Sequence, residues 1–150
     1  MKGQFQITGL GNCLVGTYAL RNLTKHFQCT SQDLLFLAGN AGKELEFTVY
    51  LLKFGYENAL IQAGGASALK IKPVEEIDLF LDTNDISSEQ YKKAFDALWI
   101  SIVGMTAEEY VEKNVKKDEE KAVEEEKKIG LTTGETLTKS DSETDTNQLN

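Results

Sequence analysis

The segment 45–61 constrains the fold of this chain more than any other. Its apolar side chains fall on every side of a helical wheel, which is typical of a helix that is buried all round or that lends a face to a partner. Residues 47–52 could also form a strand, because β-branched and aromatic side chains are common in strands. Length favours a helix from Lys43 to Ala63, since the only turn signal within it is Gly55. We expect a kink or a break near Gly55.

A small β-hairpin is predicted at the N-terminus. Residues 5–8 alternate apolar and polar side chains, residues 9–12 are turn material, and residues 13–15 are apolar. A pair of strands this short is marginal alone, so we expect it to pack against the helices that follow.

Capping residues and a proline mark the starts of four further helices. The candidate N-caps are Thr17, Thr30 or Ser31, and Ser87, which forms a capping box with Gln90. Pro73 suits the first turn of a helix, where no backbone N–H is needed. The helices expected from these signals are 17–28, 33–38, 72–81 and 87–103.

The last third of the chain has a different composition. Thr106 and Glu109 form a second capping box, and residues 107–129 are rich in acids and lysines in the i, i+4 order that stabilises a solvated helix. Residues 130–150 are rich in threonine, serine and acids, and such a composition cannot offset the entropy lost on ordering. We therefore expect a charged helical arm and then a disordered tail.

The predicted fold class is mainly α. A small N-terminal β-hairpin is followed by a compact bundle of about five helices, then by a charged solvent-exposed helix and a disordered tail. The expected domains are a helical body at 1–105, a charged arm at 106–129 and a polar tail at 130–150.

The charge and the hydropathy pattern exclude two classes of partner. The net charge of −8, from 24 acids and 16 bases, repels nucleic-acid backbones, so we expect no nucleic-acid partner. No stretch approaches the roughly 20 apolar residues that a membrane-spanning helix needs. Met1 to Gly11 lacks the layout of a secretory signal. We expect a cytoplasmic protein with reduced thiols and no membrane partner.

The residues that could carry out chemistry form weak patterns. Residues 39–44 lack the serine or threonine that a phosphate-binding loop requires, because Glu44 stands in its place. His26 is the only histidine; it could form a thiol–imidazole dyad with Cys29, or a partial zinc site with Cys29 and Cys13. The further groups that either site needs are missing, so a structural histidine and two free thiols are favoured. We expect no enzyme activity, no cofactor and no metal.

Apolar side chains are the remaining candidates for a functional surface. They gather in the central helix and in the last turns of the helix 87–103, and such residues often anchor protein interfaces. The candidate protein-binding residues are Tyr50, Phe54, Tyr56, Leu98, Trp99, Ile100 and Val103. A core position is the commoner role for any one of them, so both roles stay open.

Five stretches within about residues 1–105 occur in a distinctive order. They are Val15-Gly16-Thr17 after the hairpin, then 18–23, then 49–56 in the central helix, then 73–77, and then a final amphipathic helix. In this order and in side-chain character, the chain resembles the tail assembly chaperones of long-tailed bacteriophages.

The resemblance implies a mostly helical protein without enzyme activity that acts in the cytoplasm of an infected bacterium. Proteins of this family bind the long, aggregation-prone tape-measure protein, keep it soluble, recruit tail-tube subunits and leave before the virion is finished. The tape-measure protein and the tail-tube protein are therefore the expected partners, and self-association is left open. The alternatives are a structural virion protein or head–tail adaptor, and a small enzyme that uses His26 and Cys29.

Overall fold

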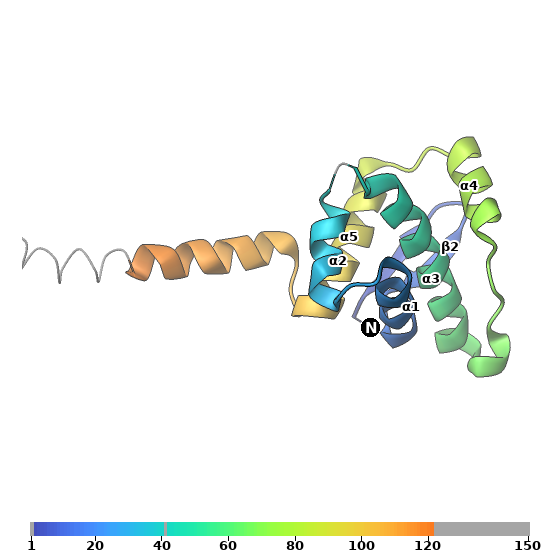
Figure 1. Cartoon of the computed structure of the whole chain (residues 1–150), viewed down its shortest axis with the longest axis horizontal. Helices are drawn as coiled ribbons and strands as arrows, with labels where there is room; N and C mark the ends of the chain where they lie inside the picture. The colour runs from blue at the N-terminus through green and yellow to red at the C-terminus, as the bar shows by residue number, and fades with distance from the viewer. Residues whose placement is uncertain (1, 41, 122–150) are drawn as a thin grey trace, which may run out of the picture. The chain divides into compact units, whose positions relative to one another are not determined.

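The computed structural model describes residues 2–40 and 42–121, and in these the chain is mainly helical (Figure 1). This confirms the predicted fold class. The elements in chain order are β1 (Gln4–Ile7), β2 (Gly11–Leu14), α1 (Thr17–Phe27), α2 (Ser31–Ala38), α3 (Glu44–Gly64), the 3-10 turn η1 (Ala66–Ala68), α4 (Val74–Thr83) and α5 (Ser88–Val103).

The chain divides into two units, Met1–Ala107 and Glu108–Asn150. Within the second unit, residues up to 121 are helical, and the apolar side chains of Val111 and Val115 are exposed. The predicted continuation of this helix to residue 129 and the predicted disorder of residues 130–150 lie outside the described residues.

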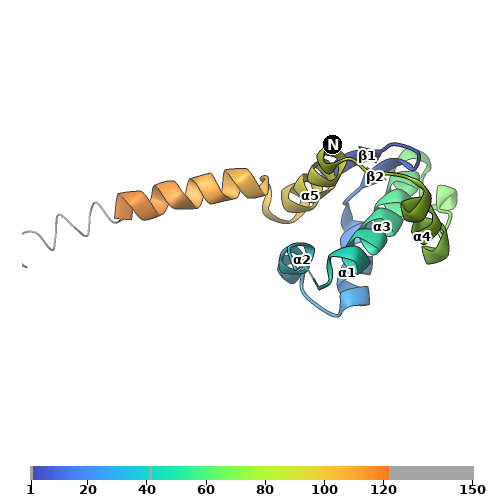
Figure 2. The ribbon, with the colours of Figure 1, turned by 90° about the horizontal axis from the view of Figure 1, so that it is seen from above.

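Helix α3 forms the centre of the first unit. The hairpin and helices α1, α2 and α4 all pack on it, with α2 and α4 on opposite sides (Figure 2). The predicted break at Gly55 is wrong, because α3 is one continuous helix. Gly55 allows the hairpin to pack closely on α3, since a Cβ placed there would lie 3.3 Å from the Cβ of Cys13 in the hairpin.

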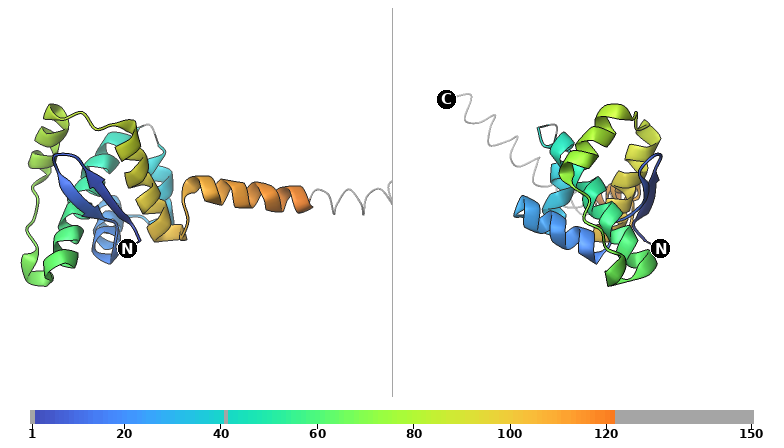
Figure 3. Two further views of the ribbon diagram at one scale, coloured as in Figure 1. Left: turned by 180° about the vertical axis from the view of Figure 1, so that it is seen from behind. Right: turned by 90° about the vertical axis from the view of Figure 1, so that its right-hand side faces the viewer.

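The hairpin pairs antiparallel, with Phe5 opposite Cys13 and Ile7 opposite Gly11. The side chains of Phe5, Ile7 and Cys13 face the core. Helix α5 runs beside β1, as the left view of Figure 3 shows. The Ser87 hydroxyl accepts the N–H of Gln90 as predicted. The Gln90 side chain does not complete the capping box but accepts the N–H of Thr8 at 2.8 Å, which fastens α5 to the hairpin.

The start of α1 is capped from another helix. The predicted N-cap Thr17 is wrong, because the N-cap position is Gly16, which has no side chain to offer. Asn58 of α3 supplies the missing acceptor: its Oδ1 accepts the N–H groups of Gly16 and Ala19, each at 3.0 Å. At α2 the predicted cap is confirmed, since Thr30 forms a capping box with Asp33.

We predict that Asn58→Ala lowers the free energy of unfolding by about 2 kcal/mol, because it leaves two backbone donors at a buried helix end without an acceptor. Urea denaturation measures the change. Asn22→Ala is the matched control, since Asn22 only donates a side-chain hydrogen bond to the carbonyl of Tyr18 within α1, and its loss costs under about 1 kcal/mol. Equal effects of the two changes would contradict the capping role.

Candidate functional site

Two of the residues predicted to bind a protein partner are core residues. Leu98 is 0% exposed and Phe54 is 9% exposed, so the prediction of a contact surface is wrong for both. Leu98 lies on the inner face of α5 with the buried residues Ala94 and Ala97, and Phe54 lies in α3, which is covered on several sides. The remaining five are partly exposed: Tyr50, Tyr56, Trp99, Ile100 and Val103.

Three of these five residues are aromatic, and each of their rings has an aromatic or cationic partner inside the chain. The His26 ring stacks on Tyr50 with centroids 3.6 Å apart. The Lys72 ammonium lies 4.4 Å from the centre of the Tyr56 ring. Trp99 packs at a tilt against Phe95, with centroids 6.3 Å apart. The structure therefore does not bring the predicted residues together into one open surface.

An apolar groove lies between the first half of α3 and the first half of α5. The groove has a volume of about 540 Å³. Leu45, which is 73% exposed, and Tyr91, which is 43% exposed, lie on its lining and are accessible to a partner. Its other lining residues are Ile7, Ala38, Glu44, Phe47, Thr48, Leu51, Leu52, Ser88, Lys92, Ala94 and Phe95. We call this surface the α3–α5 groove.

Sequence patterns missed Leu45 and Tyr91 for different reasons. Leu45 belongs to the most apolar segment of the chain, 45–61, and the apolar character of that segment predicts a buried position for it. Its position between the exposed acids Glu44 and Glu46 in the first turn of α3 was the available signal. Tyr91 shares a helical stripe with Phe95 and Leu98, and nothing in the sequence separates the exposed start of that stripe from its buried end.

The histidine and the cysteines lie in surroundings that disfavour nucleophilic chemistry. His26 Nε2 faces Glu46 Oε1 at 3.5 Å. Burial raises the pKa of the Cys13 thiol to about 12. Burial, and then the negative charge of Asp33, raise the pKa of Cys29. Both thiols are therefore protonated near neutral pH, whereas a nucleophilic cysteine needs a depressed pKa. In residues 2–40 and 42–121, no three His, Cys, Asp or Glu side chains gather as a metal site requires.

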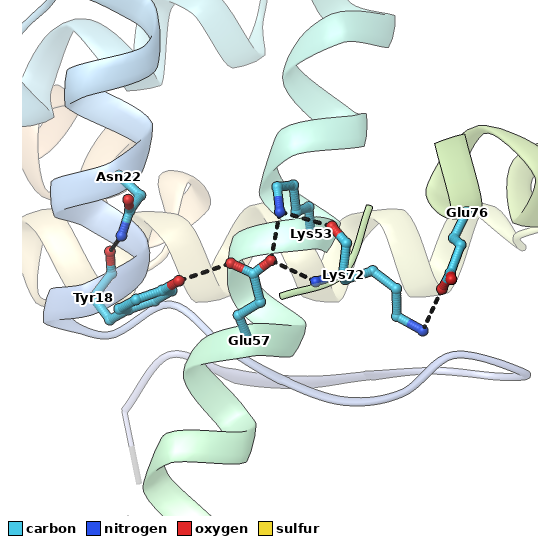
Figure 4. A network of polar contacts seen from close by, with 6 residues as sticks. All are labelled: Tyr18, Asn22, Lys53, Glu57, Lys72 and Glu76. Carbon is cyan, nitrogen blue, oxygen red and sulfur yellow. Dashed lines mark hydrogen bonds and ion pairs between the residues drawn. The ribbon is translucent and has the colours of Figure 1, made fainter. Parts of the chain in front are cut away.

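A buried polar network surrounds Glu57, whose side chain is fully buried (Figure 4). The Tyr18 hydroxyl donates to its Oε1 at 2.8 Å, while the Lys53 ammonium and the backbone N–H of Lys72 donate to its Oε2. Lys53 also donates to the Lys72 carbonyl at 2.7 Å. Burial and the hydrogen bond to the Glu57 carboxylate raise the pKa of Tyr18 to about 12. These hydrogen bonds join α1 and the segment around Lys72 to α3.

No family model, curated protein or solved structure matches the chain. Among the described residues, no helix is both long enough and apolar enough to cross a membrane.

We predict that the two cysteines of the native protein react with a disulfide reagent in two separate phases at pH 8. Cys29 reacts first but more slowly than free cysteine, because its raised pKa lowers the thiolate fraction. Cys13 reacts only after denaturant is added, because it is buried. Absorbance of the released thiol measures both phases, and Cys29→Ser removes the first. A native phase faster than free cysteine would instead favour a nucleophilic thiol.

Proposed function

We propose that this protein is a tail assembly chaperone of a long-tailed bacteriophage, without enzyme activity, that works in the cytoplasm of the infected host. It binds the tape-measure protein, keeps it soluble and helps to recruit tail-tube subunits, and it is not retained in the mature virion. The observation that carries the proposal is the open apolar groove between α3 and α5, with Leu45 and Tyr91 accessible on its lining.

The α3–α5 groove suits a helical client. Its floor includes the side chains of Phe47, Leu51 and Phe95, and Tyr91 adds an aromatic anchor of the kind enriched at interfaces. An amphipathic helix binds such a groove through apolar side chains at positions i, i+3 or i+4, and i+7. Because the groove is short and partly polar at Glu44 and Lys92, binding of modest affinity is expected, and a chaperone that must later leave needs such affinity.

The charge of the chain supports the second requirement of a holding chaperone, which is solubility of the loaded complex. The net charge is −8, and residues 107–150 carry 13 of the 24 acids. Chains of this charge repel one another. Once the apolar segments of a client are covered, this repulsion keeps the loaded complexes from aggregating.

The order of the elements is a further support. A short hairpin, a helix, a central apolar helix and a final amphipathic helix follow one another along the first unit. The sequence resemblance to the phage chaperones rests on the same order.

We predict that the double change Leu45→Asp and Tyr91→Asp abolishes co-purification with the tape-measure protein in co-expressing bacteria and leaves that protein insoluble. Two carboxylates in the groove would have to lose their hydration when an apolar helix docks. Leu79→Asp is the matched control, because Leu79 of α4 is similarly exposed, at 63%, and lies outside the groove. Circular dichroism and the melting temperature check that all variants fold. Client capture by the folded groove variant would refute the assignment of the groove.

Mass spectrometry of purified virions separates the proposal from a structural role. A chaperone is absent from finished particles, whereas a head–tail adaptor is present in stoichiometric amounts. Stoichiometric recovery of this chain from virions would reject the chaperone function in favour of the adaptor.

A further inference from the structure

One part of the first unit has few fully buried side chains, and Val74, Phe80 and Leu81 in it pack against the core while partly buried. It consists of the strap, residues 65–73, and helix α4, and we call the two together the flap. Between residues 65 and 86, all of which the structure describes, only Ile77 is buried. The strap runs back along α3 to reach α4 (Figure 1). Segments with so little buried apolar area open at lower free energy than the core does.

The strap is bound to α3 through its backbone. Glu57 accepts the N–H of Lys72 at 2.9 Å, and Lys53 donates to the carbonyl of the same residue at 2.7 Å, as Figure 4 shows. Both polar groups of one peptide residue are therefore held by a Lys–Glu pair that lies one turn apart on α3. The Lys72 side chain adds a contact with the Tyr56 ring and a surface ion pair with Glu76. We call the Lys53–Glu57 pair with Lys72 the latch.

Opening of the latch breaks its bonds to the strap but not its ion pair. Lys53 and Glu57 are four residues apart on one helix, so their ion pair survives when the strap leaves. Opening exposes both charges to water, and the hydration they regain offsets part of the free energy of the two hydrogen bonds lost to Lys72. The remaining part holds the strap closed, so the latch sets the free energy of opening.

Both ends of the flap have backbone suited to movement. Gly65 has φ of +81°, and nothing lies within 4 Å of the position that its Cβ would occupy. At the other end, the Asn84 N–H and side chain both bond to the Phe80 carbonyl and end α4. Only intermediate or exposed residues then lead from 84 to 87 into α5. The Phe80 ring lies beside Gly9 of the hairpin turn, so this contact must also break at this end of the flap.

We propose that the flap opens as one unit while the rest of the first unit stays folded, and that the latch controls this opening. The open state uncovers the face of α3 that carries Tyr56, and it exposes the Ile77 side chain on α4. The proposal concerns the fold itself and does not depend on the identity of a client.

Native-state hydrogen exchange of the full chain, followed by mass spectrometry at low denaturant concentrations, tests this proposal. In the wild type, amides of α4 are expected to exchange through an opening with weaker denaturant dependence than amides of α3, since less surface is exposed. In Glu57→Gln, α4 amides are expected to exchange about tenfold faster, because a hydrogen bond to a charged group contributes a factor of that size. Amides of α5 and of the hairpin keep their wild-type rates.

Glu76→Gln is the matched control, because it removes the ion pair with the Lys72 side chain and leaves both latch bonds to the Lys72 backbone. Its α4 amides are expected to exchange at the wild-type rate. Should Glu57→Gln fail to fold because Lys53 is left without its carboxylate, Lys53→Met with Glu57→Gln removes the stranded charge, and the same tenfold effect is expected. Equal denaturant dependence of α3 and α4 in the wild type, or an equal acceleration of every element in the variants, would overturn the proposal.

Discussion

Burial of α3 on several sides is the constraint on which the rest of the structure depends. A helix with apolar residues around its whole circumference cannot be covered by one neighbour, so hairpin, α1, α2 and α4 must each pack against a different part of it. The hairpin approaches α3 closely at Gly55, where a Cβ would lie 3.3 Å from the Cβ of Cys13. The two-stranded sheet, too short to be stable alone, gains its stability from this contact and from α5.

Helix α3 also supplies the polar groups that fix its neighbours. Two adjacent side chains, Glu57 and Asn58, are buried, and each accepts a backbone N–H of another segment. Asn58 caps the start of α1, and Glu57 holds the strap that leads to α4. Because unsatisfied buried polar groups are costly, each of these segments has one favourable position on α3. Apolar packing therefore makes the unit compact, while these two side chains determine its arrangement.

The sequence predicted the fold class because the signals for it are local. The apolar segment 45–61 required a central helix, and the capping box at Thr30 and the serine at 87 marked helix starts correctly. The cap of α1 could not be predicted, since the acceptor on Asn58 is about forty positions further along the chain. The same limit explains the missing half of the capping box at Gln90, whose side chain bonds to Thr8 instead.

The candidate site was harder to predict than the fold, because exposure depends on tertiary contacts. Phe54 and Leu98 have the side chains of interface anchors, yet they fill the core, and Leu45 has the side chain of a core residue, yet it is exposed. Periodicity assigns residues to a face of a helix but does not say how far along that face the neighbouring elements extend. Here the hairpin packs on the middle of α3, at Gly55, and the first turn of α3 stays exposed. The groove begins at this exposed turn.

The thiols, the histidine and the buried carboxylate of the described residues all have partners or surroundings inside the first unit that affect their reactivity. Both thiols are held protonated, the histidine is stacked on a tyrosine, and the one fully buried carboxylate of the described residues is committed to a lysine, a tyrosine and a backbone N–H. The α3–α5 groove is the opposite case, since its apolar lining gains free energy only when something covers it. A concave apolar surface that the first unit leaves uncovered supports the proposal that the protein holds another polypeptide.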